Sequence, residues 1–294
     1  MKQEITVFYD PRQSISDVNS FSPSAGKPAR FMEALQSQAI CHDIMPVVPA
    51  TREDLYLVHD WQYVDEVFAG VKNNGFENND PRVPQACLWT VGSMVSAVAY
   101  ASRAMGPVCS PSSGFHHAGY GWGGGYCTFN GLMVAAAKFI LANPQAKVGI
   151  LDLDWHYGDG TDNILKNKPA LVKRVLNLSS GKYFFDSNDD VSEFWAWLQG
   201  AILELNRFDC DVVIYQAGAD MHIKDPLGGL LNDAEMARRD RIVFREINAP
   251  LVFNLAGGYR GDKSSDGLGN PVLRTHLNTV LEAMVNQTLS DDRA

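Results

Sequence analysis

The sequence predicts an α/β fold in which a mainly parallel β-sheet lies between helices. Short runs rich in Val, Ile and Leu show no strict polar alternation, which is typical of strands covered on both faces. Longer helical patterns lie between these runs, as the crossover helices of βαβ units do. Polar side chains gather where several runs end, and the carboxyl ends of parallel strands are where such folds bind ligands.

The expected elements follow one another along the chain. The strands are ITVFY (5–9), GPVCS (106–110), KVGILDLDW (147–155), RVLNL (174–178), DVVIYQAG (211–218) and PLVFNLAGG (250–258). The main helical patterns cover residues 88–105, 131–143, 191–208, 234–247 and 272–285. The segment 73–85 is polar and turn-rich, and we interpret it as a surface loop.

Composition limits the class of protein. At 294 residues, 46% of them hydrophobic, the chain is long enough to bury a sizeable core. No repeat, low-complexity tract or linker rich in Pro, Gly and Ser divides it, so we expect a single domain over residues 1–294. The five cysteines are widely spaced and form no CxxC pair, which argues against a disulfide framework or a thiolate metal site.

The charge balance argues against some partners. A net charge of -9 and a pI near 5.2 disfavour broad binding to nucleic acid or to an anionic membrane, because both require a basic surface. The first residues lack the pattern of a signal peptide, and no apolar stretch approaches the roughly 18 residues of a membrane span. We therefore expect a cytoplasmic protein without membrane contact.

The segment DLDWHYGDG (152–160) places carboxylates and an imidazole where an apolar run ends. Ionised carboxylates at the edge of a core are costly unless a cation meets them. Since alternate strand residues share a face, Asp154 and His156 could both reach one ion, and a distant third ligand such as Asp220 would leave a position open for water or substrate. Three ligands with an open position indicate a catalytic metal site.

Further polar residues follow other expected strands. The pair His116 and His117 comes shortly after GPVCS, and Tyr259 follows LVFNLAGG. Taken singly, such features have structural explanations, because an Asp after a strand is usually a turn or N-cap residue and Gly-Gly is a common turn signal. Their coincidence at one edge of the sheet favours a functional site. The remaining histidines lack such a setting and are interpreted as structural: His42, His59, His222 and His276.

Four segments resemble the signature blocks of the zinc-dependent histone deacetylase family and its bacterial deacetylase and acetylpolyamine amidohydrolase-like relatives. They are SGFHHAGYGWGGGYCTFNG (113–131), DLDWHYGDGTDN (152–163), YQAGADMHIKDPLGG (215–229) and LAGGYR (255–260). VHDWQYVDEV (58–67) resembles a further family segment, so the likeness extends from about residue 5 to about residue 285. The resemblance implies the three-layer arginase/deacetylase fold, a parallel sheet of about eight strands between helices.

The resemblance also implies a role for each of these residues. Asp154, His156 and Asp220 match the family's zinc ligands. His116 and His117 match its tandem general acid/base histidines, Asp152 and Asp159 the carboxylates that pair with them, and Tyr259 the phenol that polarises the substrate carbonyl. Gly125, Tyr126 and Leu227 match positions that line the acyl-lysine tunnel.

The family further carries a structural potassium ion, bound mainly by backbone oxygens. The matching residues are Asp152, Asp154, His156, Asn177 and Leu178. Asn177 stands where a hydroxyl residue is common, and Tyr157 where a second histidine is frequent. The aspartate with which eukaryotic members grip the substrate backbone has Asp80 or Glu77 as its candidate counterpart.

The chemistry implied is metal-assisted hydrolysis of an amide, in which zinc polarises the carbonyl and a histidine moves protons. We expect a deacetylase that acts on acetyl-lysine, an acetylated polyamine or another small acylated amine and releases acetate. Iron or cobalt are further candidates for the metal, because two carboxylates and one imidazole form a hard ligand set. The alternatives are a manganese ureohydrolase of the arginase type and a non-enzymatic acyl-ligand or metal-binding sensor. The single metal set and Tyr259 argue against the first, and the complete set of catalytic residues argues against the second.

Overall fold

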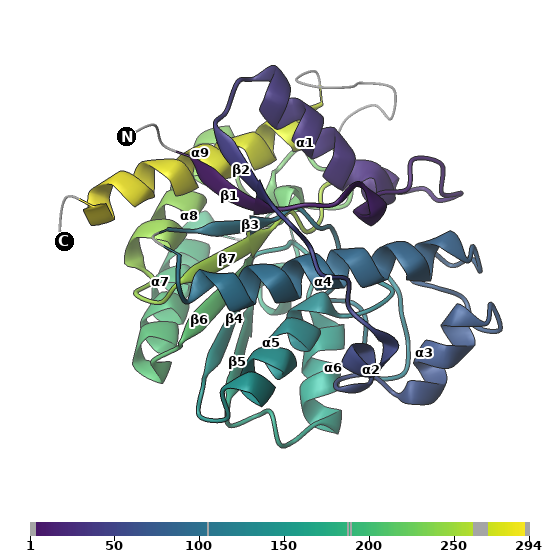
Figure 1. Ribbon diagram of the computed structural model, residues 1–294. Helices are drawn as coiled ribbons and strands as arrows, with labels where there is room; N and C mark the ends of the chain where they lie inside the picture. The colour runs from purple at the N-terminus through teal and green to yellow at the C-terminus, as the bar shows by residue number, and fades with distance from the viewer. Residues whose placement is uncertain (1–3, 105, 187, 189, 261–269, 292–294) are drawn as a thin grey trace.

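The computed structural model describes residues 4–104, 106–186, 188, 190–260 and 270–291. Its centre is a seven-stranded sheet in the order β2-β1-β3-β7-β6-β4-β5 (Figure 1). Every strand pairing in it is parallel. The strands are β1 (Ile5–Phe8), β2 (His42–Met45), β3 (Val108–Ser110), β4 (Val148–Asp152), β5 (Val175–Ser179), β6 (Val212–Gln216) and β7 (Leu251–Asn254). The parallel sheet of the prediction is confirmed, with seven strands in the described residues in place of about eight.

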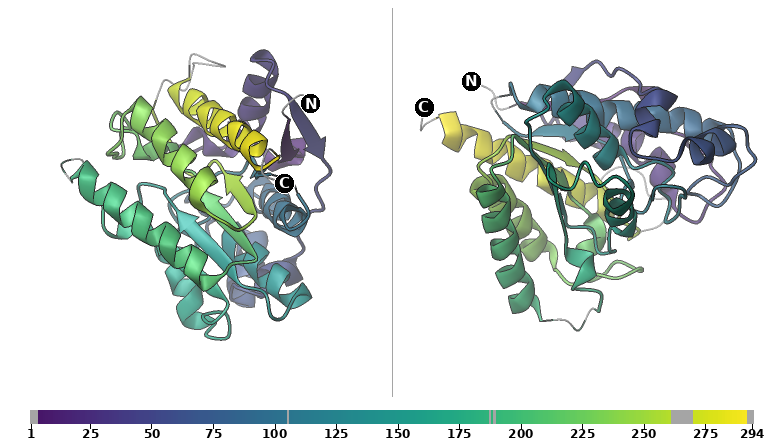
Figure 2. Two further views of the ribbon diagram at one scale, coloured as in Figure 1. Left: turned by 90° about the vertical axis from the view of Figure 1, so that its left-hand side faces the viewer. Right: turned by 90° about the horizontal axis from the view of Figure 1, so that it is seen from below.

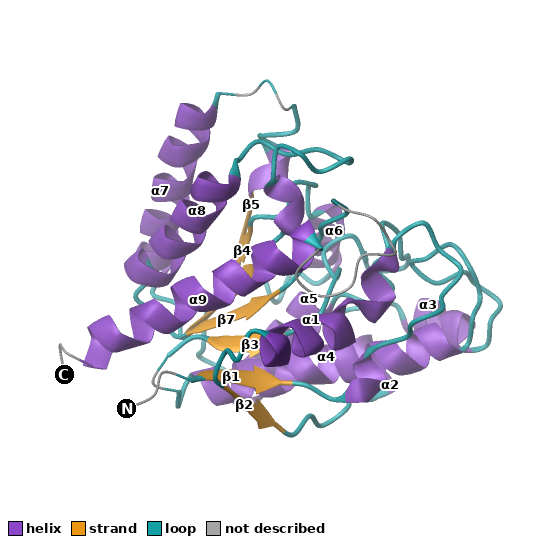
Figure 3. Cartoon of the chain, turned by 90° about the horizontal axis from the view of Figure 1, so that it is seen from above, coloured by secondary structure: helices purple, strands orange, loops and turns teal. Residues whose placement is uncertain are grey.

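Helices cover both faces of the sheet, so the chain has three layers (Figures 2 and 3). One face carries α1 (Lys27–Ser37), α7 (Val191–Phe208), α8 (Asp233–Glu246) and α9 (Pro271–Asp291). The other face carries α2 (Arg52–Tyr56), α3 (Trp61–Phe68), α4 (Arg82–Ala101), α5 (Gly131–Ala142) and α6 (Asp159–Asn167). None of the described helices is long and apolar enough to cross a membrane.

Successive side chains of the central strands enter opposite hydrophobic cores. Leu151 of β4 and Val213 of β6 pack in the core beneath α7 and α8. Their neighbours Ile150 and Ile214 pack in the core beneath α4 and α5. Because both faces of these strands are buried, apolar residues occupy consecutive positions, and this explains the missing polar alternation in the sequence.

Several elements differ from the sequence-based expectation. Helix α4 begins at Arg82 and not at residue 88, so its first turn lies in the segment predicted to be a loop. Pro84 is tolerated there because the first turn of a helix needs no backbone N–H donor at that position. Strand β2 was not predicted, since its sequence HDIM lies at the sheet edge with exposed residues and has no apolar run.

Candidate metal-dependent active site

The candidate residues lie at the carboxyl ends of four strands that are neighbours in the sheet: β3, β7, β6 and β4. His116 and His117 are in the loop after β3, and Tyr259 follows β7. Asp152 ends β4, Asp154 and His156 follow it, and Asp159 begins α6. Asp220 lies in the 3₁₀ turn Ala219–Met221 after β6. Because every strand is parallel, these ends meet at one edge of the sheet, as the sequence predicted.

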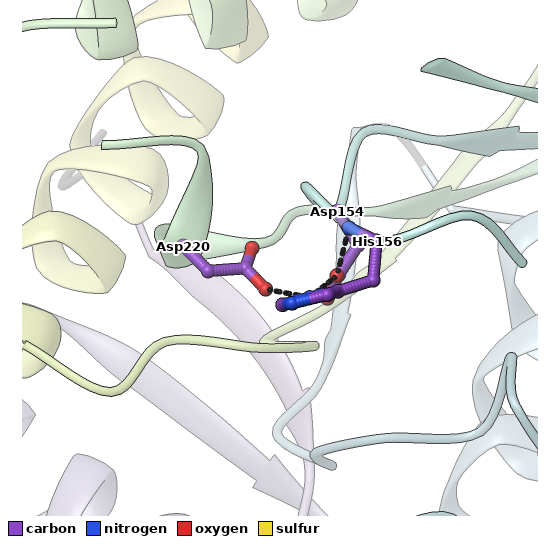
Figure 4. Close-up of side chains that lie close together, drawn as sticks. All are labelled: Asp154, His156 and Asp220. Carbon is purple, nitrogen blue, oxygen red and sulfur yellow. Dashed lines mark hydrogen bonds and ion pairs between the residues drawn. The ribbon is translucent and has the colours of Figure 1, made fainter. Parts of the chain in front are cut away.

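Asp154, His156 and Asp220 form a compact cluster (Figure 4). One ligand atom from each residue lies within 4.8 Å of the others. His156 Nδ1 lies 3.2 Å from Asp154 Oδ1 and 3.1 Å from Asp220 Oδ2. Both carboxylates are buried, with side-chain exposures of 2% and 0%. Two buried carboxylates and an imidazole that converge in this way fit a divalent cation.

Backbone N–H groups hold the two carboxylates in place. Gly257 N–H donates to Asp154 Oδ2 at 2.7 Å, and Trp155 N–H donates to Asp220 Oδ1 at 3.2 Å. A Cβ atom at residue 257 would lie 2.1 Å from Asp220 Oδ2 and 2.6 Å from Asp154 Oδ2. Glycine is therefore required at position 257, because any side chain there would displace the carboxylates.

The electrostatics of the cluster favour a cation. Two neighbouring negative charges are costly in this buried position. Burial and the charge of Asp154 therefore raise the pKa of the Asp220 carboxyl. Burial disfavours a charged His156, but hydrogen bonds with Asp154 and Asp220 outweigh it and raise the pKa of that imidazole to about 11. A site that holds a proton this strongly also attracts a metal ion, which would compete with the proton.

The tandem histidines are each paired with a carboxylate. His116 Nδ1 lies 2.9 Å from Asp152 Oδ2, and His117 Nδ1 lies 2.7 Å from Asp159 Oδ1. His116 Nε2 lies 3.7 Å from Asp154 Oδ1, so this nitrogen faces the metal cluster. Burial opposes a charged His116, but Asp152 and Asp154 outweigh it and raise its pKa to about 9, whereas burial and the charge of His116 lower the pKa of His117.

Tyr259 stands beside the same cluster. The centroid of its ring is 6.3 Å from that of His156 and 5.7 Å from that of Tyr126. Burial and the negative charges of Asp154 and Asp220 raise the pKa of the Tyr259 phenol. The hydroxyl therefore keeps its proton and is able to donate a hydrogen bond.

Two of the three predicted tunnel residues, Gly125 and Tyr126, lie against these groups. Gly125 has a φ of +51°, and a Cβ atom there would lie 2.4 Å from Cδ2 of His117. Only glycine therefore lets the backbone at position 125 approach the imidazole of His117 this closely. The Tyr126 ring contacts that of Phe76, at 5.9 Å between centroids, as well as that of Tyr259. Leu227 is 39% exposed on the segment that connects β6 to α8.

The residues matched to potassium come from the end of β4, the segment after it and the neighbouring strand β5. Ser180 Oγ donates to the backbone oxygens of Asp152 and Asp154, at 3.3 Å in each case. The amide nitrogen of Asn177 donates to Asp162 Oδ1 at 2.9 Å. The side-chain oxygen of Asn177 is buried and has no hydrogen-bond partner in the described part of the chain.

Sequence reasoning missed two charged residues of the site. Lys27 is buried, and its Nζ donates to the backbone oxygen of Ala256 at 2.7 Å; burial lowers its pKa to about 8 against the attraction of Asp220. Asp225 is buried and accepts hydrogen bonds from the backbone N–H groups of Tyr259 and Arg260. The motif that contains Asp225 was recognised, but nothing in one sequence distinguishes a buried charge from a turn residue.

Comparison with known proteins agrees with this geometry. Residues 23–187 match the family model described as Histone deacetylase domain. A probable deacetylase of Methanothermobacter thermautotrophicus is 23% identical over 87% of this chain and 86% of its own length. Histone deacetylase 2 of Arabidopsis thaliana is 26% identical over 87% of this chain and 75% of its own length. Acetylpolyamine amidohydrolase 2 of Pseudomonas aeruginosa is 26% identical over 56% of this chain and 54% of its own length.

A solved structure shares the fold. The crystal structure of acetylpolyamine aminohydrolase from Burkholderia pseudomallei superimposes with a TM-score of 0.66 over 97% of both chains, at 18% sequence identity. The seven-stranded parallel sheet between helices is thus the arginase/deacetylase fold that the resemblance implied. Since the domain model matches more than half of the sequence, the chain belongs to the histone deacetylase family.

Proposed function

We propose that this protein is a zinc-dependent amidohydrolase that removes an acetyl or other short acyl group from an amine. The substrates we propose are acetyl-lysine, an acetylated polyamine or another small acylated amine. The observation that carries this proposal is the convergence of Asp154, His156 and Asp220 beside two carboxylate-paired histidines. Relatives named as deacetylases and acetylpolyamine amidohydrolases support it.

Asp154, His156 and Asp220 would hold the divalent ion. When bound, such an ion supplies Lewis acidity at the carbonyl oxygen and lowers the pKa of a water molecule from 15.7 toward about 7. We also propose that Asp152, Asp154, His156, Asn177 and Leu178 hold a potassium ion. The buried, unpartnered oxygen of Asn177 is the kind of neutral ligand that a hard cation accepts.

His116 and His117 would move the protons. Asp152 and Asp159 engage their Nδ1 atoms, fixing each ring and leaving Nε2 to exchange protons with water and substrate. As water attacks the carbonyl carbon, one imidazole takes its proton. When the C–N bond breaks, an imidazolium returns a proton to the leaving nitrogen, so the products are a carboxylate such as acetate and a free amine.

Tyr259 would donate a hydrogen bond to the oxyanion that develops on the substrate. This bond strengthens as charge accumulates, so Tyr259→Phe should lower kcat far more than it changes substrate binding. We expect a loss of about 10²- to 10³-fold, the usual effect of removing one oxyanion donor. The measurement is steady-state turnover with the metal content of both proteins determined. Turnover of the Phe variant at the wild-type rate would show that Tyr259 is not the electrophilic group.

The test of the function as a whole is acetate release by the metal-loaded protein. Three matched panels are required: acetyl-lysine peptides, acetylated polyamines and acetylated small amines. We expect turnover of at least one class and inhibition by a hydroxamate, which chelates through the open coordination position. Absence of turnover on all panels, with metal content confirmed, would favour the sensor alternative, and urea production from arginine with manganese would favour the ureohydrolase.

A further inference from the structure

One buried carboxylate joins the two segments that follow the neighbouring strands β6 and β7, beyond the end of their pairing. Asp225 is 7% exposed and lies between Asp220 and α8. Its Oδ2 accepts hydrogen bonds from the backbone N–H groups of Tyr259 at 2.7 Å and of Arg260 at 2.9 Å. Its Oδ1 accepts from the N–H of Leu227 at 3.0 Å. Hydrogen bonds to an ionised acceptor are roughly twice as strong as neutral ones, so this carboxylate binds the two segments firmly.

The hydrogen bonds from Tyr259 and Arg260 to Asp225, called the tie below, matter because of the residues that precede Tyr259. Gly257 is held, because its N–H donates to Asp154 Oδ2 and its carbonyl oxygen accepts from the N–H of Ala219. Gly258, between it and Tyr259, has a φ of +138°, and a glycine leaves the backbone at this position more conformational freedom than any other residue would. Ala256 is fixed through its carbonyl oxygen, which accepts from Lys27 and from Ser113 Oγ. On the far side of Gly258, the hydrogen bond to Asp225 fixes the backbone of Tyr259 itself.

A second contact links the same two segments. Arg260 Nη1 lies 3.0 Å from Nε2 of His222, a residue of the segment that carries Asp225. His222 in turn lies 3.1 Å from Asp233 Oδ1 at the start of α8. The segment that holds Tyr259 in place is therefore itself attached to a helix that packs on the sheet.

From this geometry we infer that Asp225 is a positioning residue, which sets the place of the Tyr259 phenol relative to Asp154, His156 and Asp220. The inference rests on the proposed function, since it assigns the tie a role in that reaction. It also couples two parts of the site, because the same carboxylate holds the backbone of Leu227. Loss of the tie would let Tyr259 move, and displacement of a reacting group by about 1 Å costs up to about 100-fold in rate.

The test is a double-mutant cycle between Asp225→Asn and Tyr259→Phe. The amide keeps one acceptor oxygen but turns an NH₂ group toward at least one of the N–H donors, so the tie is weakened without a change of volume. We expect Asp225→Asn to lower kcat about 10- to 100-fold with metal content and hydroxamate affinity close to wild type. In the Tyr259→Phe background the same change should have little further effect, because the rate no longer depends on the phenol.

Asp211→Asn is the matched control. Asp211 also accepts a backbone N–H, that of Lys147 at 2.8 Å, but it precedes β6 at the opposite end of the sheet. This variant should keep the wild-type rate. Should Asp225→Asn fail to give folded, metal-loaded protein, Asp225→Ser, which leaves a hydroxyl acceptor, enters the same cycle.

Two results would overturn the inference. One is an unchanged kcat in Asp225→Asn, and the other is an equal loss in both backgrounds, which would mean that Asp225 acts on the fold and not through Tyr259. The cycle also separates this inference from the proposed function. If Tyr259→Phe itself has no effect, the proposed mechanism fails; if Tyr259→Phe is impaired and Asp225→Asn is not, only the role of Asp225 fails.

Discussion

At the scale of the single residue, hydrogen bonding decides whether a buried histidine has a nitrogen left for chemistry. His59 is 1% exposed, its Nδ1 lies 2.8 Å from the carbonyl oxygen of Gly119, and its Nε2 accepts from the N–H of Asn130 at 2.9 Å. Both nitrogens are used within the fold. His116, in contrast, uses Nδ1 for Asp152 and directs Nε2 toward the metal cluster.

The bonding of His59 predicts a pH dependence of stability. Burial lowers its pKa from 6.5 to about 4, so the folded protein keeps the ring neutral while the unfolded chain takes up a proton below about pH 6.5. The free energy of unfolding should therefore fall as the pH drops from about 6.5 toward 4, by up to about 1.4 kcal/mol per pH unit from this residue. His276, whose pKa burial also lowers, adds to the slope in the same direction.

Urea unfolding of His59→Gln and wild type across this pH range measures the contribution. Gln is able to donate to Gly119 and accept from Asn130 but does not titrate, so the variant should show the shallower slope. Above about pH 7.5 the two slopes should agree, which serves as the internal control. Equal slopes between pH 4 and 6.5 would show that the ring is not held neutral.

His222 shows where residue-level reasoning from sequence stops. We interpreted it as structural, and its ring does bond to Asp233 and to the N–H of Lys224. It also contacts Arg260, next to Tyr259, a contact that joins residues 38 positions apart. Asp225 likewise meets Tyr259 only in the folded chain. Such partners are set by tertiary structure, so spacing along the sequence does not show them.

At the scale of the element, helix α8 supports the strand ends that carry the candidate metal ligands. Arg239 is completely buried and donates from Nη1 to the backbone oxygens of Gly218 at 2.7 Å and Leu153 at 3.3 Å. Leu153 directly precedes Asp154, and Gly218 is two positions before Asp220. Its charge is met by Asp240 Oδ1 at 2.8 Å, and Asp240 also accepts from the hydroxyl of Thr279 on α9.

We expect Arg239→Ala to lower the free energy of unfolding by about 3–5 kcal/mol, because it leaves the buried charge of Asp240 unpaired. Arg241→Ala on the same helix is the matched control. Arg241 pairs with Glu282 at 2.6 Å but is 46% exposed, and exposed pairs contribute only about 0–1 kcal/mol. Urea denaturation of wild type, Arg239→Ala and Arg241→Ala measures these free energies of unfolding. Similar decreases in both variants would refute a special role for the buried pair of Arg239 and Asp240.

Helices and strands were predictable from the sequence where their burial requires a recognisable apolar pattern. The six strands with apolar runs were found because both of their faces are covered. Strand β2 exposes Asp43 and Ile44 at the sheet edge, so it lacks an apolar run. Helices α2 and α3 are short and follow polar turns, so neither has a helical apolar pattern long enough to detect. The metal cluster was predictable because Asp154 and His156 are close in sequence and a known motif supplied Asp220.

At the scale of the whole molecule, the order of strands explains why distant segments form one site. β3 lies between β1 and β7, and β6 lies between β7 and β4, so the last two strands of the chain lie between the first three and the middle two. The first three strands and the last four share both hydrophobic cores: Val7 of β1 lies in one core with Val213 of β6, and Val108 of β3 lies in the other with Ile150 of β4. These shared cores support the expectation of one domain over residues 1–294. That expectation stays a prediction, as does the cytoplasmic location.

The same topology predicts that metal binding stabilises the entire fold. Asp154 and His156 follow β4 and Asp220 follows β6, so an ion held by all three would connect neighbouring strand ends that unfolding must separate. A ligand that binds only the folded state adds about 2.7 kcal/mol at 100 times its Kd. Chelation should therefore lower the midpoint of thermal unfolding, and added zinc should restore it. Asp220→Ala should abolish this dependence on zinc, whereas Asp211→Ala, an exposed carboxylate at the opposite end of the sheet, should retain it. An Asp220→Ala protein that still gained stability from zinc, with one ion per chain by metal analysis, would place the ion elsewhere.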